Sequence, residues 1–269
     1  MLEGWAEPCL PGGRQLISKH QMTTYNPFSL KGKTVFVTGA SSGIGRGIAI
    51  ACSRMGAALQ LNGRNEERLA ATLAALEGTG HNIVTGDLLV KDDVERIVTQ
   101  LPALDGVVHC AGIGERKICK QIEQTDIDNL MGANFEAPVK LQTLLLQKKK
   151  IKKSSSIVFI ASVAPFAPTI GNALYSASKG ALIAYANCLS IELAPRQVRV
   201  NCICPGMIWT DLIYRGGLTE EELREDEQKY PLKRYGTPDD VANAVIYLLS
   251  DASSWMTGTC LKIAGGIIN

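Results

Sequence analysis

The sequence predicts an α/β fold in which helices cover both faces of a parallel sheet. Two observations lead to this prediction. Short runs of apolar and β-branched residues alternate along the chain with longer segments whose apolar residues recur at helical spacing. The first of these runs also ends in a glycine-rich turn that passes directly into a helical segment. Strands that alternate with helices build right-handed βαβ units, and the parallel sheet made from them has both faces buried.

Seven segments are expected to form the strands. They are short and mostly rich in Val, Ile or Leu, as strands buried on both faces must be. In chain order they are residues 34–38, 58–63, 82–87, 103–110, 155–162, 198–206 and 259–265. Helices are expected at residues 44–56, 65–78, 91–101, 126–150, 175–194 and 237–250. The last helix has a clear start, because Thr237 can cap it, Pro238 fits its first turn and two acids follow.

Length and composition fit one domain. A chain of 269 residues with 46% hydrophobic content can bury one large core, and no second domain is indicated. A net charge of +2 does not favour a nucleic acid or another polyanion as partner. The sequence has neither an apolar run long enough to span a bilayer nor the apolar stretch of a secretory signal, so no membrane association is expected.

The cysteines are scattered through predicted core segments. They are Cys9, Cys52, Cys110, Cys119, Cys188, Cys202, Cys204 and Cys260. None of them stands at metal-ligand spacing with the three histidines, so no metal is expected, and the free thiols suit a reducing cytoplasm. Cys202 and Cys204 alternate on a predicted strand and therefore share one face. This leaves a redox or metal role open beside the simpler interpretation as small core residues.

The amino-terminal residues differ from the rest of the chain. Residues 1–29 are expected to be a disordered extension, and residues 30–269 the folded domain. Met22 opens a short lead into the first strand, which prompts the hypothesis that translation begins there and that residues 1–21 are dispensable. A truncated protein lacking residues 1–21 that failed to fold or lost activity would contradict this hypothesis.

The glycine-rich turn has the features of a pyrophosphate site. In the segment Lys33–Gly45, an apolar strand leads through TGASSGIG into a helix. Gly39 permits the tight turn, and Gly43 and Gly45 let the backbone approach the phosphates and the helix pack closely on its strand. The predicted contacts are Gly39, Ser41, Ser42, Gly43, Ile44 and Gly45. The alternative interpretation is an ordinary glycine turn between a strand and a helix.

A second motif predicts proton-transfer chemistry. Tyr175 and Lys179 are four residues apart, so they lie on one side of a helix, and Ser162 ends an apolar strand thirteen residues upstream of Tyr175. A cation held close to a phenol favours its ionised form, which suits Tyr175 for proton delivery. The alternative is a tyrosine and a lysine on a solvated helix face.

The end of the second predicted strand indicates which coenzyme binds. No carboxylate that could bind a ribose 2′-hydroxyl stands at Leu61–Gly63, whereas Arg64, next to Asn65, offers a planar fork suited to a 2′-phosphate. NADP(H) is therefore expected rather than NAD(H). The alternative is that Arg64 is a surface residue and that Glu66 or Glu67 binds the ribose.

With these motifs in order, the chain from Leu30 to Asn269 resembles the classical short-chain dehydrogenases/reductases, and within them the 3-oxoacyl-[acyl-carrier-protein] reductase-like branch. The resemblance rests on TGASSGIG, Asp87–Leu88, Cys110–Ala111–Gly112, Asn134, Ser162, the YSASK run and PGMIWT at residues 205–210. One departure is visible. The family usually carries Asn-Asn-Ala-Gly where this chain has His109–Cys110–Ala111–Gly112, so a thiol replaces an amide that braces the central strand.

The resemblance implies a single-domain Rossmann fold with strand order 3-2-1-4-5-6-7 and ligands at the carboxyl ends of the strands. It implies that Asp87, with Leu88 beside it, holds the adenine, and that Cys110, Ala111 and Gly112 line the nicotinamide ribose. The carboxamide is expected at Thr210 and the backbone of Ile208, after the Pro205–Gly206 turn. Ser162 is expected to orient the substrate oxygen, Tyr175 to protonate it, Lys179 to bind the ribose, and Asn134 to hold a water that resupplies protons. The alternative for Asn134 is a helix residue bonded to backbone.

The expected function is NADPH-dependent reduction of a ketone, with a 3-oxoacyl thioester as the model substrate. Reduction of a free ketone, steroid or sugar stays open, as do a nucleotide-sugar epimerase or dehydratase and a non-catalytic NADP-binding regulator. The polar segment 209–235 suits a mobile lid. The lysines at 148–153, expected to end a long helix, could dock an acidic carrier or simply be solvated, and Ile191 stands where carrier-linked relatives often have a docking arginine. The resemblance also implies a homo-oligomer, a dimer or tetramer.

Overall fold

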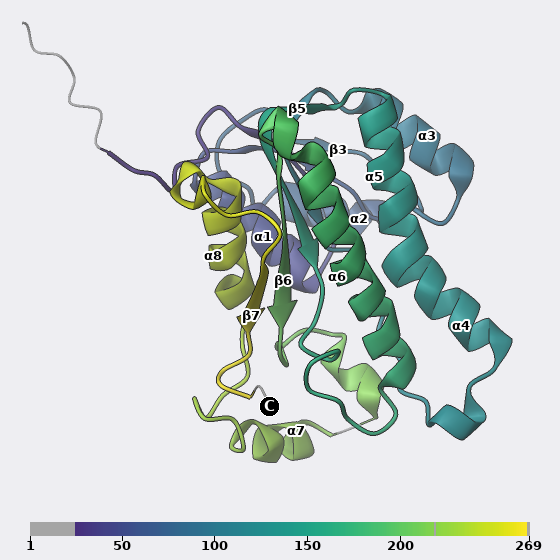
Figure 1. Ribbon diagram of the computed structural model, residues 1–269. Coiled ribbons are helices and arrows are strands. Elements are labelled where there is room, and N and C mark those ends of the chain that lie inside the picture. The colour runs from purple at the N-terminus through teal and green to yellow at the C-terminus, as the bar shows by residue number, and fades with distance from the viewer. Residues whose placement is uncertain (1–24, 218, 268–269) are drawn as a thin grey trace, which may run out of the picture.

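The computed structural model of the chain describes residues 25–217 and 219–267. Its centre is a seven-stranded parallel sheet with the order β3-β2-β1-β4-β5-β6-β7 (Figure 1). The strands are β1 (Thr34–Val37), β2 (Ala58–Leu61), β3 (Asn82–Ile83), β4 (Leu104–His109), β5 (Ile151–Ile160), β6 (Arg199–Pro205) and β7 (Cys260–Ile263). The predicted doubly wound Rossmann sheet and its strand order are confirmed.

Eight α-helices connect and cover these strands in the described part of the chain. They are α1 (Gly43–Arg54), α2 (Glu66–Leu73), α3 (Lys91–Gln100), α4 (Gln124–Met131), α5 (Ala137–Gln147), α6 (Ala173–Leu193), α7 (Glu220–Glu227) and α8 (Pro238–Leu249). A π-helical turn, η2 (Gly132–Glu136), joins α4 to α5. Short 3-10 turns lie at η1 (Cys119–Gln121), η3 (Ala194–Arg196), η4 (Ile213–Gly216) and η5 (Asp251–Ser253). Helix α7 was not predicted, because its polar sequence indicated only a loop.

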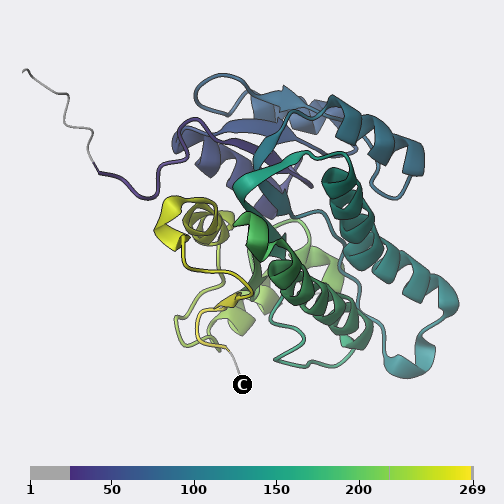
Figure 2. The same ribbon diagram turned by 45° about the horizontal axis from the view of Figure 1, so that its top comes forward.

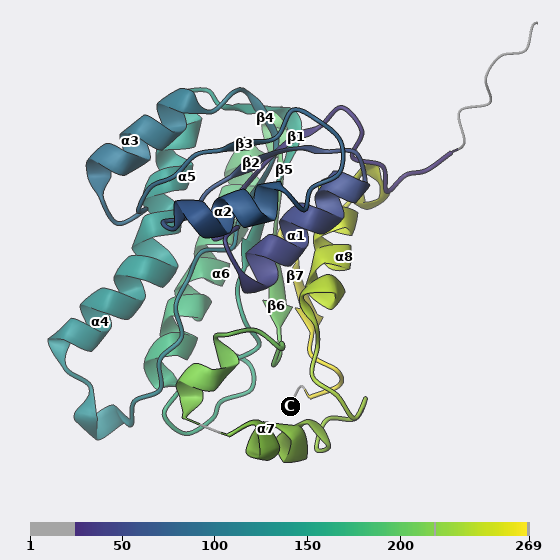
Figure 3. The same cartoon turned by 180° about the vertical axis from the view of Figure 1, so that it is seen from behind.

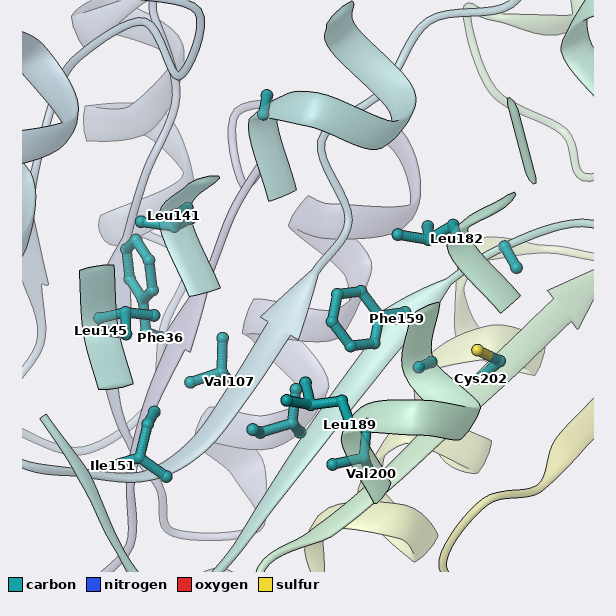
Figure 4. Packing of buried hydrophobic residues seen from close by; sticks show 14 of the residues in the cluster. Phe36, Val107, Leu141, Leu145, Ile151, Phe159, Leu182, Leu189, Val200 and Cys202 are labelled. Atoms are coloured by element: carbon teal, nitrogen blue, oxygen red, sulfur yellow. The ribbon is translucent and has the colours of Figure 1, made fainter. Parts of the chain in front are cut away.

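The two faces of the sheet bury separate cores, because successive side chains of a strand point to opposite sides. Val107 belongs to the core beneath α3, α5 and α6, whereas Val108 belongs to the core beneath α1 and α8. Figure 4 shows the first core, with Phe36 and Phe159 among the aliphatic side chains of α5 and α6. Helices α4 to α6 lie in front of the sheet in Figure 1, and α1 and α2 lie in front of it in Figure 3, seen from behind. Figure 2 shows the same layers with α8, in yellow, nearly end-on. No helix among the described residues is both long and apolar enough for a bilayer crossing.

The start of the described chain already packs on the domain. The Pro27 carbonyl accepts a hydrogen bond from the Ala252 amide at 3.0 Å, and the amide of the fully buried Leu30 donates to the Met55 carbonyl at 2.9 Å. Packing therefore begins a few residues before the domain boundary predicted at residue 30. The expectations for residues 1–21 and for Met22 as a start fall outside the described residues.

The lysine-rich segment after α5 corrects one expectation. Helix α5 ends at Gln147, and β5 begins at Ile151, so Lys152 and Lys153 belong to a strand rather than to a helix end. The reason is tertiary: Ile151 is buried and pairs with Leu104 at the start of β4, and Lys152 forms an ion pair with Asp105 at 2.8 Å.

Candidate active site

The glycine turn between β1 and α1 is too narrow for side chains. A Cβ on Gly45 would lie 2.2 Å from the Gly39 carbonyl oxygen, and a Cβ on Gly39, whose φ is +67°, would lie 3.0 Å from the backbone of Ala111. Gly43 also has a positive φ, and a Cβ there would lie 3.2 Å from the methyl group of Thr210. The turn thus presents bare backbone, as close contact with a pyrophosphate requires.

The amino terminus of α1 is open to an anion. Ser42 is the N-cap residue but makes no side-chain cap bond, and the first turn contains no acidic residue. Helices α2, α7 and α8, in contrast, each begin with a side-chain cap and acids in the first turn. The free amides of α1 and its helix dipole therefore favour a negatively charged ligand. These features fit a dinucleotide coenzyme with its phosphates on the predicted residues, Ser41 and Ile44 included.

Two polar side chains that the sequence interpretation missed brace this coenzyme edge. The Thr38 hydroxyl accepts hydrogen bonds from the amides of Cys110 and Ala111 at 3.0 and 3.1 Å, which joins the ends of β1 and β4. The buried Asn62 donates to the carbonyls of Val84 and Gly86 at 2.9 and 3.3 Å. A polar residue that directly follows an apolar strand was the available signal for both. The backbone of Cys110 is therefore held by Thr38. Burial of the Cys110 thiol raises its pKa to about 12.

The residues expected at the adenosine end lie together at the ends of β2 and β3. The Arg64 guanidinium is 3.6 Å from a carboxylate oxygen of Asp87, and both side chains reach solvent. Leu88 is buried beside Asp87. Asn65 is committed to α2 as its cap, because its side-chain oxygen accepts from the Arg68 amide at 2.8 Å.

Helix α6 brings the predicted tyrosine and lysine together. The Lys179 ammonium is 5.9 Å from the centre of the Tyr175 ring and donates to the Ile160 carbonyl at 3.0 Å. The Lys179 side chain is buried, and a Cβ on Gly112 would lie 3.4 Å from its ammonium. The solvated-face alternative is therefore wrong for Lys179, whose ammonium lies between the end of β5 and the loop after β4.

Ser162 lies where β5 ends, facing the start of α6. Its oxygen accepts a hydrogen bond from the Ala164 amide at 3.1 Å, so its own hydrogen is free to be donated to a ligand. The Ser176 hydroxyl, one residue after Tyr175, donates to the Ala164 carbonyl at 3.2 Å. This bond and the Lys179–Ile160 bond tie the start of α6 to the end of β5 on both sides of Ser162.

Asn134 sits in the π-helical turn between α4 and α5 and is fully buried. Its oxygen accepts from the Ile113 amide at 2.8 Å, and its nitrogen donates to the Ile113 carbonyl at 3.0 Å and to Ser178 at 3.1 Å. The backbone-bonded arrangement is thus present, and it locks the loop after β4 to α6. A Cβ on Gly112 would lie 2.9 Å from the Asn134 oxygen, so this oxygen and the Lys179 ammonium border the same point. Ser178, inside the YSASK run, is a further supporting residue that the sequence interpretation missed.

The loop that follows β6 lies beside the glycine turn and borders the candidate site there. The Pro205 carbonyl accepts from the Val163 amide, and the Gly206 amide donates to the Ile263 carbonyl. Ile208 forms an isolated β-bridge with Gly236. The Thr210 side chain lies next to Gly43 in the glycine turn. The predicted carboxamide-binding residues therefore lie next to the predicted pyrophosphate site.

The segment expected as a lid contains structure of its own. Helix α7 lies beyond the carboxyl ends of the strands (Figure 1), and Leu223 forms a small core with Tyr230 and Tyr235. Trp209 donates to the Glu227 carboxylate at 3.1 Å, and the Arg224 guanidinium lies 4.4 Å from the Trp209 ring. Part of the segment expected as a lid thus forms a helix that packs on Trp209 in the loop after β6.

In the segment His109–Gly112, which departs from the family's usual Asn-Asn-Ala-Gly, His109 forms a buried polar pair with Gln142. The His109 ring stacks on Phe159 at 4.5 Å, and its Nε2 is 2.9 Å from the Gln142 side-chain oxygen, so the neutral ring with a proton on Nε2 fits this contact. Burial lowers the pKa of His109 to about 4, and the hydrogen bond with Gln142 opposes this shift. The β4 end is therefore held by Thr38 and by this pair.

Replacing His109 with Asn should flatten the pH dependence of stability. In the folded protein His109 stays neutral down to a pKa of about 4, whereas the unfolded chain binds its proton below about pH 6.5. Stability should therefore fall as the pH drops through this window, with about 2–3 kcal/mol lost by pH 4.5. Urea unfolding of both proteins at pH 7 and 4.5 measures the difference. Equal losses in the two proteins would show that His109 is not the group responsible.

Fold and site together define an oxidoreductase of the nicotinamide-coenzyme class. The model of a family described as enoyl-(acyl carrier protein) reductase matches residues 39–268. The 3-oxoacyl-[acyl-carrier-protein] reductase FabG of Rickettsia felis is 34% identical over 239 residues, which cover 89% of this chain and 98% of that protein. The chain belongs to the short-chain dehydrogenase/reductase family, whose members use NAD(P).

Solved structures agree. A short-chain dehydrogenase/reductase from Brucella melitensis, titled a glucose/ribitol dehydrogenase, is 33% identical with a TM-score of 0.82, covering 89% of this chain and 98% of that one. The angucycline C-6 ketoreductase LanV, solved with bound NADP, is 25% identical with a TM-score of 0.82. The match covers 88% of this chain and 96% of that one. The relatives support the expected class of reaction, ketone reduction by a short-chain reductase.

Proposed function

We propose that this protein reduces a ketone to a secondary alcohol with NADPH, and that Tyr175 delivers the proton. The observation that carries the proposal is that Lys179 lies beside the Tyr175 ring, and that Lys179 and Ser176 bond to the backbone on either side of Ser162. The glycine turn between β1 and α1 is in addition bare enough for a pyrophosphate. A bound nicotinamide coenzyme supplies the hydride for such a reduction.

The protein groups act on the charge that develops at the substrate oxygen. As the carbonyl carbon is reduced, its oxygen gains negative charge, and hydrogen-bond donors placed there lower the barrier. The Ser162 hydroxyl, whose oxygen is already bonded to the Ala164 amide, is oriented to donate to this oxygen. Tyr175 transfers its proton to the same oxygen, and the buried Lys179 ammonium stabilises the phenolate that is left.

The supporting groups hold this geometry and renew the proton. Lys179 is fixed by the Ile160 carbonyl, which leaves two of its ammonium hydrogens for the ribose hydroxyls and for proton exchange. Asn134 uses both amide hydrogens within the protein, so the water it is proposed to hold would bind the second lone pair of its oxygen, close to Lys179. Asn134 lies in the π-helical turn, and such turns are frequent at functional sites, which agrees with a functional role for this residue.

NADPH is the proposed coenzyme because Arg64 is the charged group at the end of β2 that can meet a 2′-phosphate. Its guanidinium is largely exposed and only loosely paired with Asp87 at 3.6 Å, so it is able to turn to a phosphate. Glu66 and Glu67 are exposed in the first turn of α2, where they complement the helix dipole. The NADP bound in the LanV structure supports the same preference.

Replacing Arg64 with Ala should raise the KM for NADPH about 10-fold or more, because a charge-assisted contact with the 2′-phosphate is lost. The KM for NADH should change little, since that coenzyme has no 2′-phosphate. Arg68→Ala, which removes an exposed arginine one turn further along α2, is the matched control. An unchanged ratio of NADPH to NADH activity in the Arg64 variant would remove Arg64 from coenzyme selection.

A 3-oxoacyl thioester is the first substrate to test, because FabG reductases are among the relatives. The decisive experiment follows NADPH oxidation with a panel of 3-oxoacyl thioesters, free diketones, steroids and keto sugars. Consumption of NADPH with at least one ketone class is the expected result. Tight NADPH binding without turnover on any of them would favour a non-catalytic NADP-binding regulator.

Two observations favour a free ketone as the second candidate. Ile191, at the position of the carrier-docking arginine, is 77% exposed on α6. The lysine-rich segment lies at the start of β5, before Ser156, and the six residues from Ser156 to Ser162 rise about 3.3 Å each, so these lysines are about 20 Å or more from Ser162. An acidic carrier docked there would sit at the wrong end of the sheet. Faster turnover of a free ketone than of its carrier-linked form would select this candidate.

A further inference from the structure

Three cysteines of this chain gather on one face of the sheet beside the active site. Strands β6 and β7 pair in parallel, with Cys202 opposite Cys260 and Cys204 opposite Lys262. Cys202 and Cys204 point into the core beneath α6, where Figure 4 shows Cys202 near Phe159 and Leu182, and Cys260 packs against the same core. Directly paired residues on neighbouring strands point to the same side, so the three thiols share a face.

The spacing of one pair suits a covalent bond. Neighbouring strands lie about 4.8 Å apart, and the Cα atoms of a disulfide lie roughly 4.4–6.8 Å apart. Cys202 and Cys260 are direct partners in the register, whereas Cys204 is a diagonal neighbour of Cys260. All three are free thiols in the structure.

The three thiols differ in exposure and acidity. Cys202 and Cys204 are buried, whereas Cys260 is only partly buried, on the edge strand. Hydrogen bonds from Cys202 and then Cys204, together with the charge of Lys262, lower the pKa of Cys260 to about 7 even though burial opposes this. The same contact with Cys260, followed by burial, raises the pKa of Cys202 far above its ordinary value. The first proton therefore leaves Cys260, and Cys202 stays protonated beside the thiolate.

A metal site does not fit this arrangement. Within residues 25–217 and 219–267 there is no group of three or more side chains placed to hold one metal ion. Thiol oxidation, in contrast, needs only a reactive thiolate and one neighbour within reach.

We propose that Cys260 and Cys202 form an oxidant-responsive dithiol, in which a peroxide oxidises Cys260 and Cys202 then closes a disulfide between β7 and β6. This inference does not depend on the proposed reductase function. The cross-link would tie the edge strand β7 to β6, which ends at Pro205 next to the loop of the candidate site.

The chemistry balances in two steps. The Cys260 thiolate attacks one peroxide oxygen, the O–O bond breaks, and the sulfur becomes a sulfenic acid while the other oxygen leaves as hydroxide and takes up a proton to form water. The Cys202 sulfur then attacks the Cys260 sulfur, the S–O bond breaks, and the hydroxyl leaves with the Cys202 proton as a second water. Two electrons pass from the thiols to the peroxide.

Peptide mapping of the full chain tests the proposal. The reduced protein is treated with hydrogen peroxide, quenched with a maleimide and digested with trypsin. Cys260 then lies on the peptide 235–262, and Cys202 and Cys204 both lie on the peptide 200–215. A cross-link between these peptides, assigned to Cys202 by fragmentation and formed within a monomer on a non-reducing gel, is the expected result. A cross-link to Cys204, or a Cys260 that is oxidised without any cross-link, would overturn the proposal.

Substitution of single cysteines tests which thiol reacts with the oxidised Cys260. Cys202→Ala should leave a sulfenic acid on Cys260 that dimedone traps, whereas Cys204→Ala should retain the cross-link. Cys188→Ser, which removes an exposed thiol of α6, is the matched control and should leave the yield unchanged. Alkylation of Cys260 by iodoacetamide should reach half its maximal rate near pH 7, as its lowered pKa requires. A midpoint at that of an ordinary thiol, above about pH 8, would exclude Cys260 as the attacking group.

Discussion

Tyr175→Phe is expected to reduce kcat for ketone reduction by about 100-fold or more, because the variant lacks the only proton that its ring could deliver to the substrate oxygen. Coenzyme affinity should be largely kept. The ring remains beside Lys179, and the glycine turn, Arg64 and the Lys179–Ile160 bond are untouched. The loss should thus appear in kcat, as it does when an interaction of the transition state is removed.

The measurement combines steady-state turnover with NADPH titration by fluorescence. Tyr185→Phe is the matched control, because Tyr185 lies on the same helix but packs at the core with Phe135 and Phe159. That control should keep near-normal turnover. A Tyr175→Phe protein with a normal rate would remove Tyr175 from the catalytic role, and one that no longer binds NADPH would show that its hydroxyl serves the coenzyme instead.

Gly45→Ala is expected to weaken NADPH binding by about 100-fold or more. The added methyl group would lie 2.2 Å from the Gly39 carbonyl oxygen and 2.7 Å from its carbon, and both are backbone atoms that cannot rotate away. The turn must shift, and a shift of about 1 Å in a positioning element is enough to cost this much. Overpacking of this kind should also lower the free energy of unfolding by about 1–3 kcal/mol.

Gly180→Ala provides the comparison for this prediction. A Cβ there would lie 3.8 Å from Pro165, which is an ordinary contact, and Gly180 is inside α6. Alanine should stabilise the helix by about 0.5–1 kcal/mol and leave NADPH affinity unchanged. Isothermal titration with NADPH and urea unfolding measure both effects. Equal coenzyme affinity in the two variants would contradict the role of the bare glycine backbone at Gly45.

Much of the candidate site was predictable because its chemistry follows local spacing. Tyr175 and Lys179 share a helix face for any helix that contains them, and the glycines of TGASSGIG predict a tight turn wherever they occur. Arg64 and Asp87, each predicted to contact the coenzyme, also form an ion pair with each other, which no local pattern predicts. Residues 151–153, expected at the end of a long helix, form the start of β5 instead, because the pairing of β5 with β4 overrides their helix-like composition.

What the sequence alone determined is the fold class, the alternation of strands with the helices other than α7, and the residue types at the coenzyme edge. These depend on periodicity and on short motifs, which act over a few residues. Only the tertiary structure decided that Thr38 braces Cys110, that His109 pairs with Gln142, that Asn134 bonds to Ile113 and Ser178 and that Cys202 faces Cys260. The reason is physical: each of these contacts joins residues far apart in the chain, and their meeting is set by the register of the sheet and the packing of the helices.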